Sequence, residues 1–161
     1  MIHTRLAKKT DLWPLVKLFD EFYSKFNMAQ ILKGTTKDLL EVDNQEKFAR
    51  DTIRDYLDGN YIIYVAEESS HLVGYICGLI HVRNHYKYSP EAEIIDWFVT
   101  EKLRNKGIGK ELYNTFYEEI TKRSCRSISL ESFYTNINAV GIYEKMGFIK
   151  DSLILKKIIQ D

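Results

Sequence analysis

Residues 96–110 read DWFVTEKLRNKGIGK. In this stretch an apolar run, Trp97–Val99, is followed by a short basic loop, and Gly107 and Gly109 open the segment after it. The order predicts a strand, a turn and then a helix, whose start presents unpaired backbone N–H groups and the positive end of the helix dipole. Because glycines let a phosphate approach the backbone closely, the stretch is a candidate diphosphate site.

The loop carries positive charge, and it matches neither of two common phosphate-binding motifs, the P-loop and the Rossmann fingerprint. The charge comes from three loop residues: Arg104, Lys106 and Lys110. A P-loop would need Gly at position 104 and Ser or Thr at position 111, where this chain has Arg104 and Glu111. A Rossmann fingerprint that starts at Gly107 would need Gly or Ala at position 112, which is Leu112. The alternative without a ligand is a glycine-rich turn that caps a helix.

Hydrophobic periodicity predicts strands and helices on both sides of this loop. We expect strands at residues 2–6, 61–67, 72–82, 91–99, 127–133 and 148–158. We expect helices at residues 12–26, 44–57, 107–122 and 137–146. The order β-α-α-β-β-β-α-β-α-β mixes hairpins with crossovers. It predicts one α/β domain over residues 1–161, with a mixed central sheet flanked by helices on both faces.

Composition excludes several functional classes. The chain has 161 residues, with 23 Lys plus Arg and 23 Asp plus Glu, so it lacks the cationic excess of a general nucleic-acid binder or a polybasic membrane protein. The apolar run at residues 72–80 is shorter than the roughly 20 residues that span a bilayer. Residues 1–5 show no signal-peptide core, and Cys77 and Cys125 form no CxxC pair or disulfide framework. We therefore expect a cytoplasmic protein without nucleic-acid or membrane partners.

The histidines do not predict a metal site. His81 and His85 are four residues apart, but Val82 breaks the HExxH pattern, and the segment is predicted to be strand and loop rather than helix. We expect no bound metal.

Two motifs in this chain resemble those of a known family. Arg104-x-x-Gly107-x-Gly109 after an apolar strand resembles motif A of the GCN5-related N-acetyltransferase (GNAT) superfamily. Residues 136–148 read NINAVGIYEKMGF and look like its motif B, N-x-x-A-x-x-x-Y-x-x-x-G-F. One departure is Gly141 inside the predicted helix, which costs about 1 kcal/mol relative to Ala.

Two further segments extend the resemblance over nearly the whole chain in family order. Residues 72–75, LVGY, look like the third-strand signature of the family. Arg5 and Asp11 before an apolar helix look like its first strand and helix.

The resemblance implies an N-acetyltransferase that moves the acetyl group of acetyl-CoA to an amine by direct transfer in a ternary complex. The cofactor-binding residues that it implies are Phe98, Val99, Arg104, Asn105, Lys106, Gly107, Ile108, Gly109, Lys110 and Asn136. In such enzymes the strand backbone, here Phe98 and Val99, aligns the pantetheine where the fourth and fifth strands splay. Asn136 matches a residue that contacts the CoA arm, and it also suits a helix N-cap.

Three residues are candidates for acid–base catalysis. Tyr143 matches the motif B tyrosine that protonates the leaving thiolate, and its alternative is a helix-packing aromatic. Diamine acetyltransferases of the family carry a Glu-Asp pair here, which reads Ile95-Asp96 in this chain, so only Asp96 remains as base. Glu93 resembles the base position of histone-type members under a gapped alignment. Strand alternation puts Glu93 and Asp96 on opposite faces unless a bulge intervenes.

The acceptor that we expect is a small cationic amine, similar to a polyamine or an aminoglycoside. Substrate choice is expected to rest on the first two helices and on the loop at residues 83–90. The alternatives are a protein or peptide N-terminus or lysine, and a non-catalytic acetyl-CoA-binding regulatory module. Family members often form dimers, so a homodimer is expected.

Overall fold

The fold is a five-stranded mixed sheet in a computed structural model that describes residues 2–24 and 41–157. The strands lie in the order of the chain: β1 (Ile2–Leu6), β2 (Ile62–Glu68), β3 (His71–His81), β4 (Glu91–Val99) and β5 (Ser127–Leu130). The pairs from β1 to β4 are antiparallel, and β5 runs parallel to β4. This confirms the α/β architecture with a mixed sheet.

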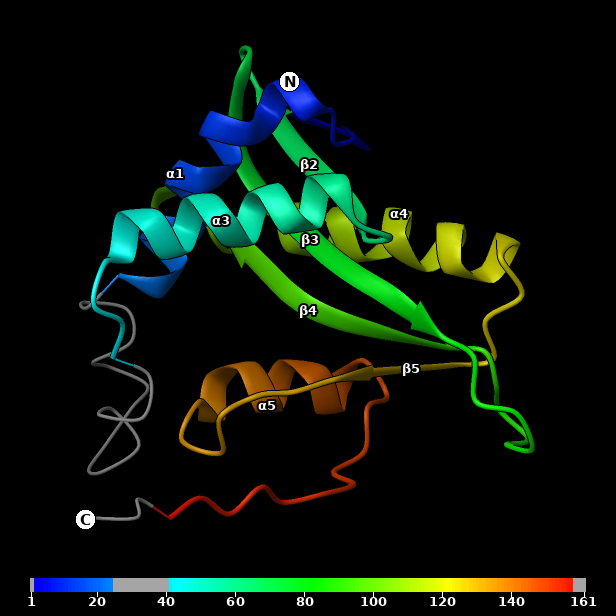
Figure 1. The fold of residues 1–161 in the computed structure, drawn as a ribbon. Coiled ribbons are helices and arrows are strands. Elements are labelled where there is room, and N and C mark those ends of the chain that lie inside the picture. Colours follow the sequence, from blue (N-terminus) through cyan, green and yellow to red (C-terminus); the bar gives the residue numbers. More distant parts are fainter. Residues whose placement is uncertain (1, 25–40, 158–161) are drawn as a thin grey trace.

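Helices cover both faces of the sheet (Figure 1). The helices are α1 (Leu12–Tyr23), α3 (Gln45–Asp58), α4 (Ile108–Lys122) and α5 (Ile137–Lys145), with 3-10 turns η1 (Lys9–Asp11) and η4 (Glu101–Leu103). On one face α1 and α3 pack together over a core that includes Phe19, Ile53 and Tyr75. On the other face α4 packs Leu112 and Phe116 against Ile76. The sheet therefore has a core on each side.

The predicted element order holds as far as β5 and α5, but the predicted last strand is wrong. Residues 148–157 have no regular secondary structure. Ile149 and Leu155 in this segment are 86% and 84% exposed. A strand forms only when a neighbour satisfies its backbone groups, and an apolar sequence pattern alone does not supply that neighbour. The predicted first helix ends at Tyr23, and Phe26 lies outside the described residues.

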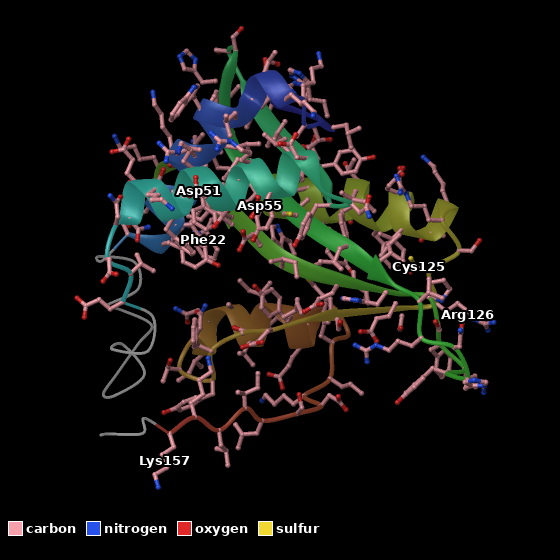
Figure 2. The ribbon with its side chains drawn as sticks, viewed as in Figure 1. Phe22, Asp51, Asp55, Cys125, Arg126 and Lys157 are labelled. Atoms are coloured by element: carbon pink, nitrogen blue, oxygen red, sulfur yellow. The ribbon has the colours of Figure 1, made fainter. Side chains whose placement is uncertain are left out.

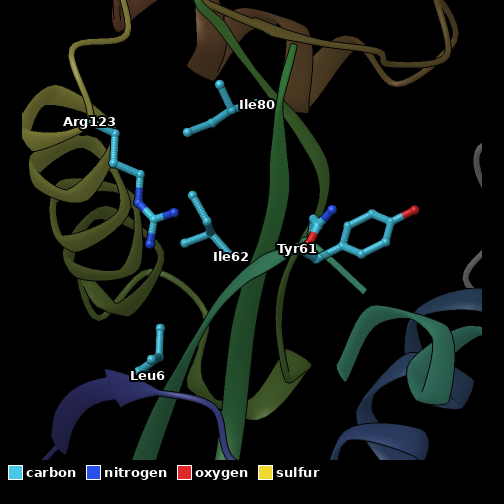
Figure 3. A pocket seen from close by; sticks show the side chains of 6 residues that line it. Leu6, Tyr61, Ile62, Ile80 and Arg123 are labelled. Carbon is cyan, nitrogen blue, oxygen red and sulfur yellow. The ribbon is translucent and has the colours of Figure 1, made fainter. Parts of the chain in front are cut away.

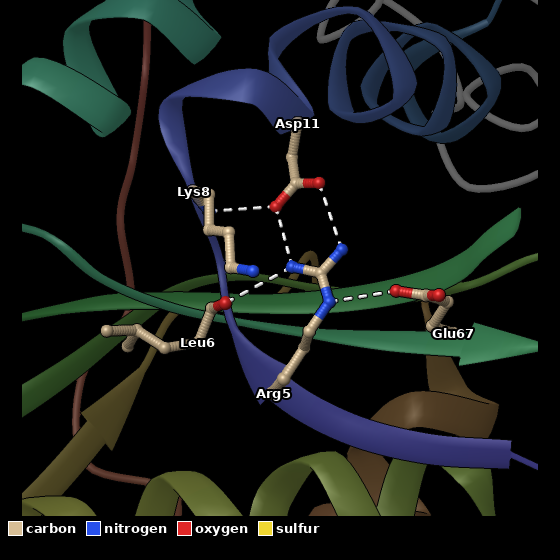
Figure 4. A network of polar contacts seen from close by, with 5 residues as sticks. All are labelled: Arg5, Leu6, Lys8, Asp11 and Glu67. Carbon is tan, nitrogen blue, oxygen red and sulfur yellow. Dashed lines mark hydrogen bonds and ion pairs between the residues drawn. The ribbon is translucent and has the colours of Figure 1, made fainter. Parts of the chain in front are cut away.

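Arg5 joins β1 to the start of α1 and to β2 (Figure 4). Its guanidinium donates to both carboxylate oxygens of Asp11, at 2.7 and 3.0 Å, and its Nε donates to Glu67 at 2.8 Å. The backbone N–H of Lys8 also donates to Asp11, at 2.8 Å. The hydrogen bond from Arg5 holds the pKa of Asp11 below its usual value, although burial acts in the opposite direction. Arg5 and Asp11, which carry the resemblance to the family's first strand and helix, thus form an ion pair.

Phe22, near the end of α1, connects this helix to β4 (Figure 2). Its ring stacks on Phe98 with centroids 5.2 Å apart. Its neighbour Tyr23 stacks on Phe19 at 4.4 Å and hydrogen-bonds Asp96 of β4. The end of α1 is therefore anchored to the part of β4 that precedes the glycine loop.

No helix in residues 2–24 and 41–157 is long and apolar enough to cross a bilayer. The same described residues contain no group of three His, Cys, Asp or Glu side chains arranged to hold a metal ion.

Candidate active site

The glycine loop connects β4 to α4 with the geometry of an anion-binding turn. Asn105 and Gly107 both have positive φ, 63° and 83°, and Gly107 is the N-cap of α4. Ile108 is buried and fixes the first turn of the helix in the core. The first N–H groups of the helix have no partner within it and carry the positive end of its dipole. The predicted helix start is confirmed to within one residue.

The two glycines leave open space over this helix start. A Cβ atom added to Gly107 would meet nothing within 4 Å. One added to Gly109 would reach Trp97 Nε1 only at 3.5 Å, which is ordinary van der Waals contact. Apart from the local backbone, no atom of the described residues lies closer than 3.5 Å to either added Cβ, so the turn leaves room for a diphosphate.

Basic side chains surround the same turn. Arg104, Lys106 and Lys110 are exposed. The Nε of Arg104 donates to the backbone carbonyl of Val99 at 3.0 Å, and its guanidinium lies 5.6 Å from the centre of the Phe98 ring. Arg104 thus folds back over the end of β4 and brings its charge beside the strand.

The fourth and fifth strands separate just before this turn (Figure 1). Pairing between them covers only Glu91 to Ile94 of β4 against Ser127 to Leu130 of β5. Beyond that point β4 continues to Val99, paired with β3 on its other edge. The backbone of Trp97, Phe98 and Val99 therefore faces an edge that β5 has left, where an extended ligand can hydrogen-bond as a strand does.

Helix α5 brings Tyr143 to this part of β4. The ring of Tyr143 stacks on Trp97 with centroids 5.8 Å apart and meets Phe148 at 6.0 Å. Burial raises the pKa of Tyr143 above its ordinary value, so its O–H remains protonated at neutral pH. Asn136 caps α5, since its side chain accepts from the N–H of Ala139 at 3.5 Å. Tyr143 thus packs as an aromatic and is also able to donate a proton.

A bulge in β4 brings the two candidate carboxylates to one face of the sheet. The register pairs Cys77 with Asp96 but Gly78 with Ile94, so β4 has one extra residue at Ile95. Ala92 and Ile94 lie in the α4-side core, whereas Ile95 and Phe98 pack on the α1–α3 side. Glu93 and Asp96 consequently share the α1–α3 face. Simple alternation would have separated them.

The surroundings of the two carboxylates differ. Asp96 is 1% exposed and accepts hydrogen bonds from Tyr23 at 3.0 Å and Tyr75 at 3.3 Å. Burial raises the pKa of Asp96, and hydrogen bonds from Tyr23, Tyr56 and Tyr75 oppose that rise. Glu93 has a side-chain exposure of 35% and lies 2.6 Å from His81 Nε2. Of the two, Glu93 is the carboxylate that solvent and solutes reach.

Two sets of contacts made by the candidate carboxylates could not be predicted from the sequence. They are the contact of His81 with Glu93 and the contacts of the tyrosines with Asp96. The sequence indicates His81 only through its four-residue spacing from His85, which is a metal-ligand spacing. Its actual partner lies on the adjacent strand, 12 residues away in the chain. Cross-strand register was the missing signal, because it depends on the bulge and on the loop at residues 82–90.

Two surface hollows are lined mainly by other residues, although the second one reaches Thr100 at the end of β4. One, of about 380 Å³, is lined by Leu6, Asn60, Tyr61, Ile62, Ile80 and Arg123 (Figure 3). The other, of about 420 Å³, lies around Arg5, Asp11 and Glu67. Neither contains residues 104–110, Glu93 or Tyr143.

Comparison with known proteins gives one family and one fold. The profile of the Acetyltransferase (GNAT) family matches residues 19–148. Among curated proteins, N-alpha-acetyltransferase 30 of Xenopus laevis is 28% identical over 137 residues, which are 84% of this chain and 47% of that protein. The human protein of the same name is 27% identical over 84% of this chain and 36% of its own length. The chain thus spans less than half the length of these two relatives.

Solved structures share the whole fold. A GCN5-related N-acetyltransferase from Ralstonia eutropha superposes with a TM-score of 0.74 at 18% identity, over 98% of this chain and 99% of that one. The aminoglycoside N-acetyltransferase AAC(6')-Iy, solved in complex with CoA, gives 0.75 at 15% identity, over 100% and 96%.

Proposed function

Because the chain belongs to the acetyltransferase (GNAT) family, we propose that it transfers the acetyl group of acetyl-CoA directly to a primary amine in a ternary complex. The observation that carries this proposal is the conjunction at the end of β4. There the glycine turn of α4 follows a strand edge that β5 has left, and Tyr143 packs on Trp97 beside that edge.

The residues expected to hold acetyl-CoA all lie along this edge. The N–H groups of Ile108, Gly109 and Lys110 would bind the diphosphate, with Arg104, Asn105, Lys106 and Gly107 around it. The backbone of Phe98 and Val99 would bind the pantetheine arm as an added strand. Asn136 at the start of α5 is the further residue proposed to contact the same arm. When bound, acetyl-CoA supplies the thioester that the amine attacks.

The chain's own residues supply the proton transfers. An acceptor amine is mostly protonated at neutral pH and must lose a proton before it attacks. Glu93 is the proposed base, since its side chain is 35% exposed and solvent reaches it. A rise of about 3.3 Å per residue separates Glu93 from Trp97 by roughly 13 Å along the strand, so we propose that the proton moves through water.

Tyr143 is the proposed acid, which donates its phenolic proton to the departing thiolate. Asp96, which the sequence also marked as a candidate base, is enclosed by tyrosine hydroxyls. We propose that it acts indirectly, by holding the end of α1 on β4 beneath Phe98.

For the acceptor, we propose a small cationic amine. Support comes from Glu91 and Glu93, which place negative charge at the start of β4, and from the exposed rings of Tyr86 and Tyr88 in the neighbouring loop. A second candidate is the α-amine of a peptide. It is favoured by the curated relatives, which are named N-alpha-acetyltransferases.

An acceptor panel tests the proposal and separates the candidates. Release of free CoA would be measured with polyamines, aminoglycosides, peptides with a free α-amine, and N-blocked peptides that contain lysine. Turnover of the first two classes supports the proposed acceptor, and turnover of free-α-amine peptides alone replaces it with the second. Calorimetric binding of acetyl-CoA without turnover of any amine would instead indicate the non-catalytic binding module.

The homodimer remains a prediction. Sedimentation at micromolar concentration tests it, and a monomer alone would contradict it.

A further inference from the structure

His81 and Glu93 form a close pair on neighbouring strands. His81 is the last residue of β3, and its Nε2 lies 2.6 Å from Oε2 of Glu93 in β4. Their side chains are 33% and 35% exposed, so solvent reaches both. With the carboxylate ionised, Nε2–H is the donor, and hydrogen bonds to a charged acceptor are among the strongest in proteins. His81 therefore binds Oε2 of Glu93. Among the described residues, the structure records no contact that occupies the other carboxylate oxygen, Oε1.

The polar and charged side chains next to this pair, Ser129 and Arg83, contact Glu91 and not Glu93. Glu91 lies two residues before Glu93 on the same face of β4. Its Oε1 accepts a hydrogen bond from Ser129 at 3.0 Å and lies 3.8 Å from Nη2 of Arg83. The guanidinium of Arg83 is thus paired with Glu91. Among the described residues, His81 is the side chain that the structure pairs with Glu93.

We propose that His81 is a positioning residue for catalysis: it holds the Glu93 carboxylate in the orientation in which Oε1 accepts the proton of the acceptor amine. This inference rests on the proposed function. The role of His81 goes beyond the proposed function, because the family motifs of this chain do not include His81.

The proton and electron balance of the step is simple. The acceptor ammonium gives one proton to Glu93 Oε1 through water, and Glu93 returns it to bulk solvent. The neutral nitrogen attacks the thioester carbonyl carbon, so a C–N bond forms as the C–S bond breaks. The nitrogen loses its second proton to solvent, the thiolate takes one from Tyr143, and Tyr143 is reprotonated from solvent. His81 keeps its own proton throughout.

Two substitutions at position 81 test this role. His81→Leu removes the donor with similar bulk, whereas His81→Gln keeps an N–H that can reach the carboxylate. We expect His81→Leu to lower kcat about 10- to 100-fold, the size expected for one hydrogen bond to a charged group. The KM for acetyl-CoA should be unchanged. His81→Gln should recover most of the rate.

The matched control is His71→Leu, because His71 begins the strand that His81 ends and its Nδ1 bonds only the carbonyl of Ser69 among the contacts that the structure records. It should leave kcat and the KM for acetyl-CoA unchanged. The double variant His81→Leu/Glu93→Gln should be no slower than Glu93→Gln alone, since residues that act as a unit are non-additive.

Different results overturn different claims. An active wild type whose His81→Leu variant keeps its kcat overturns the role of His81 and leaves the proposed function standing. The same holds if His81→Leu only lowers the melting temperature, as a cross-strand pair that merely supports the sheet would do. A wild type that binds acetyl-CoA but acetylates no amine overturns the proposed function and this inference with it.

Discussion

Tyr143→Phe separates general-acid catalysis from packing at the α5 position. Phenylalanine keeps the stack on Trp97 at 5.8 Å and the contact with Phe148 at 6.0 Å. Each such aromatic pair contributes about 0.5–1.5 kcal/mol beyond the area it buries. The substitution removes only the O–H, so we expect the free energy of unfolding to change by less than about 1 kcal/mol. In a chain of this size that is a melting-temperature shift within about 2–4 °C.

The effect on rate should be much larger. General acid catalysis contributes about 10²- to 10⁴-fold, which is about 3–5 kcal/mol of activation free energy at 1.36 kcal/mol per tenfold. Because burial raises the pKa of Tyr143 above its usual 10, the hydroxyl stays protonated at neutral and mildly basic pH. The deficit of the variant should therefore be nearly constant from about pH 6 to about pH 9.

The assay is kcat from CoA release with the best acceptor, together with calorimetric acetyl-CoA affinity and thermal unfolding. Affinity should change little, because the turn at residues 104–110 is proposed to supply most of the binding. Tyr117→Phe is the matched control, since Tyr117 stacks on Tyr113 at 5.8 Å in the same row of rings. If Tyr143→Phe melts normally and turns over within about threefold of wild type, well below the general-acid range, Tyr143 has no part in the mechanism.

Three further predictions concern binding and stability. Gly109→Glu should abolish acetyl-CoA binding in calorimetry while circular dichroism stays normal, because a carboxylate would occupy the place of the phosphates; a folded variant with unchanged affinity contradicts the diphosphate site. Asp96→Asn should lower the free energy of unfolding in urea by about 1–3 kcal/mol, because the amide accepts fewer hydrogen bonds from the buried tyrosines; an equally stable variant contradicts that network. Asp11→Asn should cost a similar amount at neutral pH. The lowered pKa of Asp11 means that its pairing with Arg5 stabilises the fold above about pH 4 and that this contribution is lost as pH falls further, so the difference from wild type should vanish in acid rather than persist.

Most of the local elements of this protein could be predicted from its sequence. β4 has exactly its predicted bounds, Glu91–Val99, and α4 begins one residue after the predicted start. Both depend on signals within a few residues: an alternating apolar run, and glycines at a turn where positive φ is needed. The same signals carried the family resemblance, because the phosphate turn is built from one continuous stretch of backbone.

The contacts of side chains across strands depend on the tertiary structure. The bulge at Ile95 puts Glu93 and Asp96 on one face of the sheet. The register of β3 on β4 pairs His81 with Glu91, and the His81 side chain reaches diagonally to Glu93. Burial beneath α1 enclosed Asp96 with tyrosines that are 21 and 73 residues away in the chain. The predicted strand at residues 148–158 found no partner over its described part. Pairing, register and burial are properties of two segments together, so no pattern within either segment contains them.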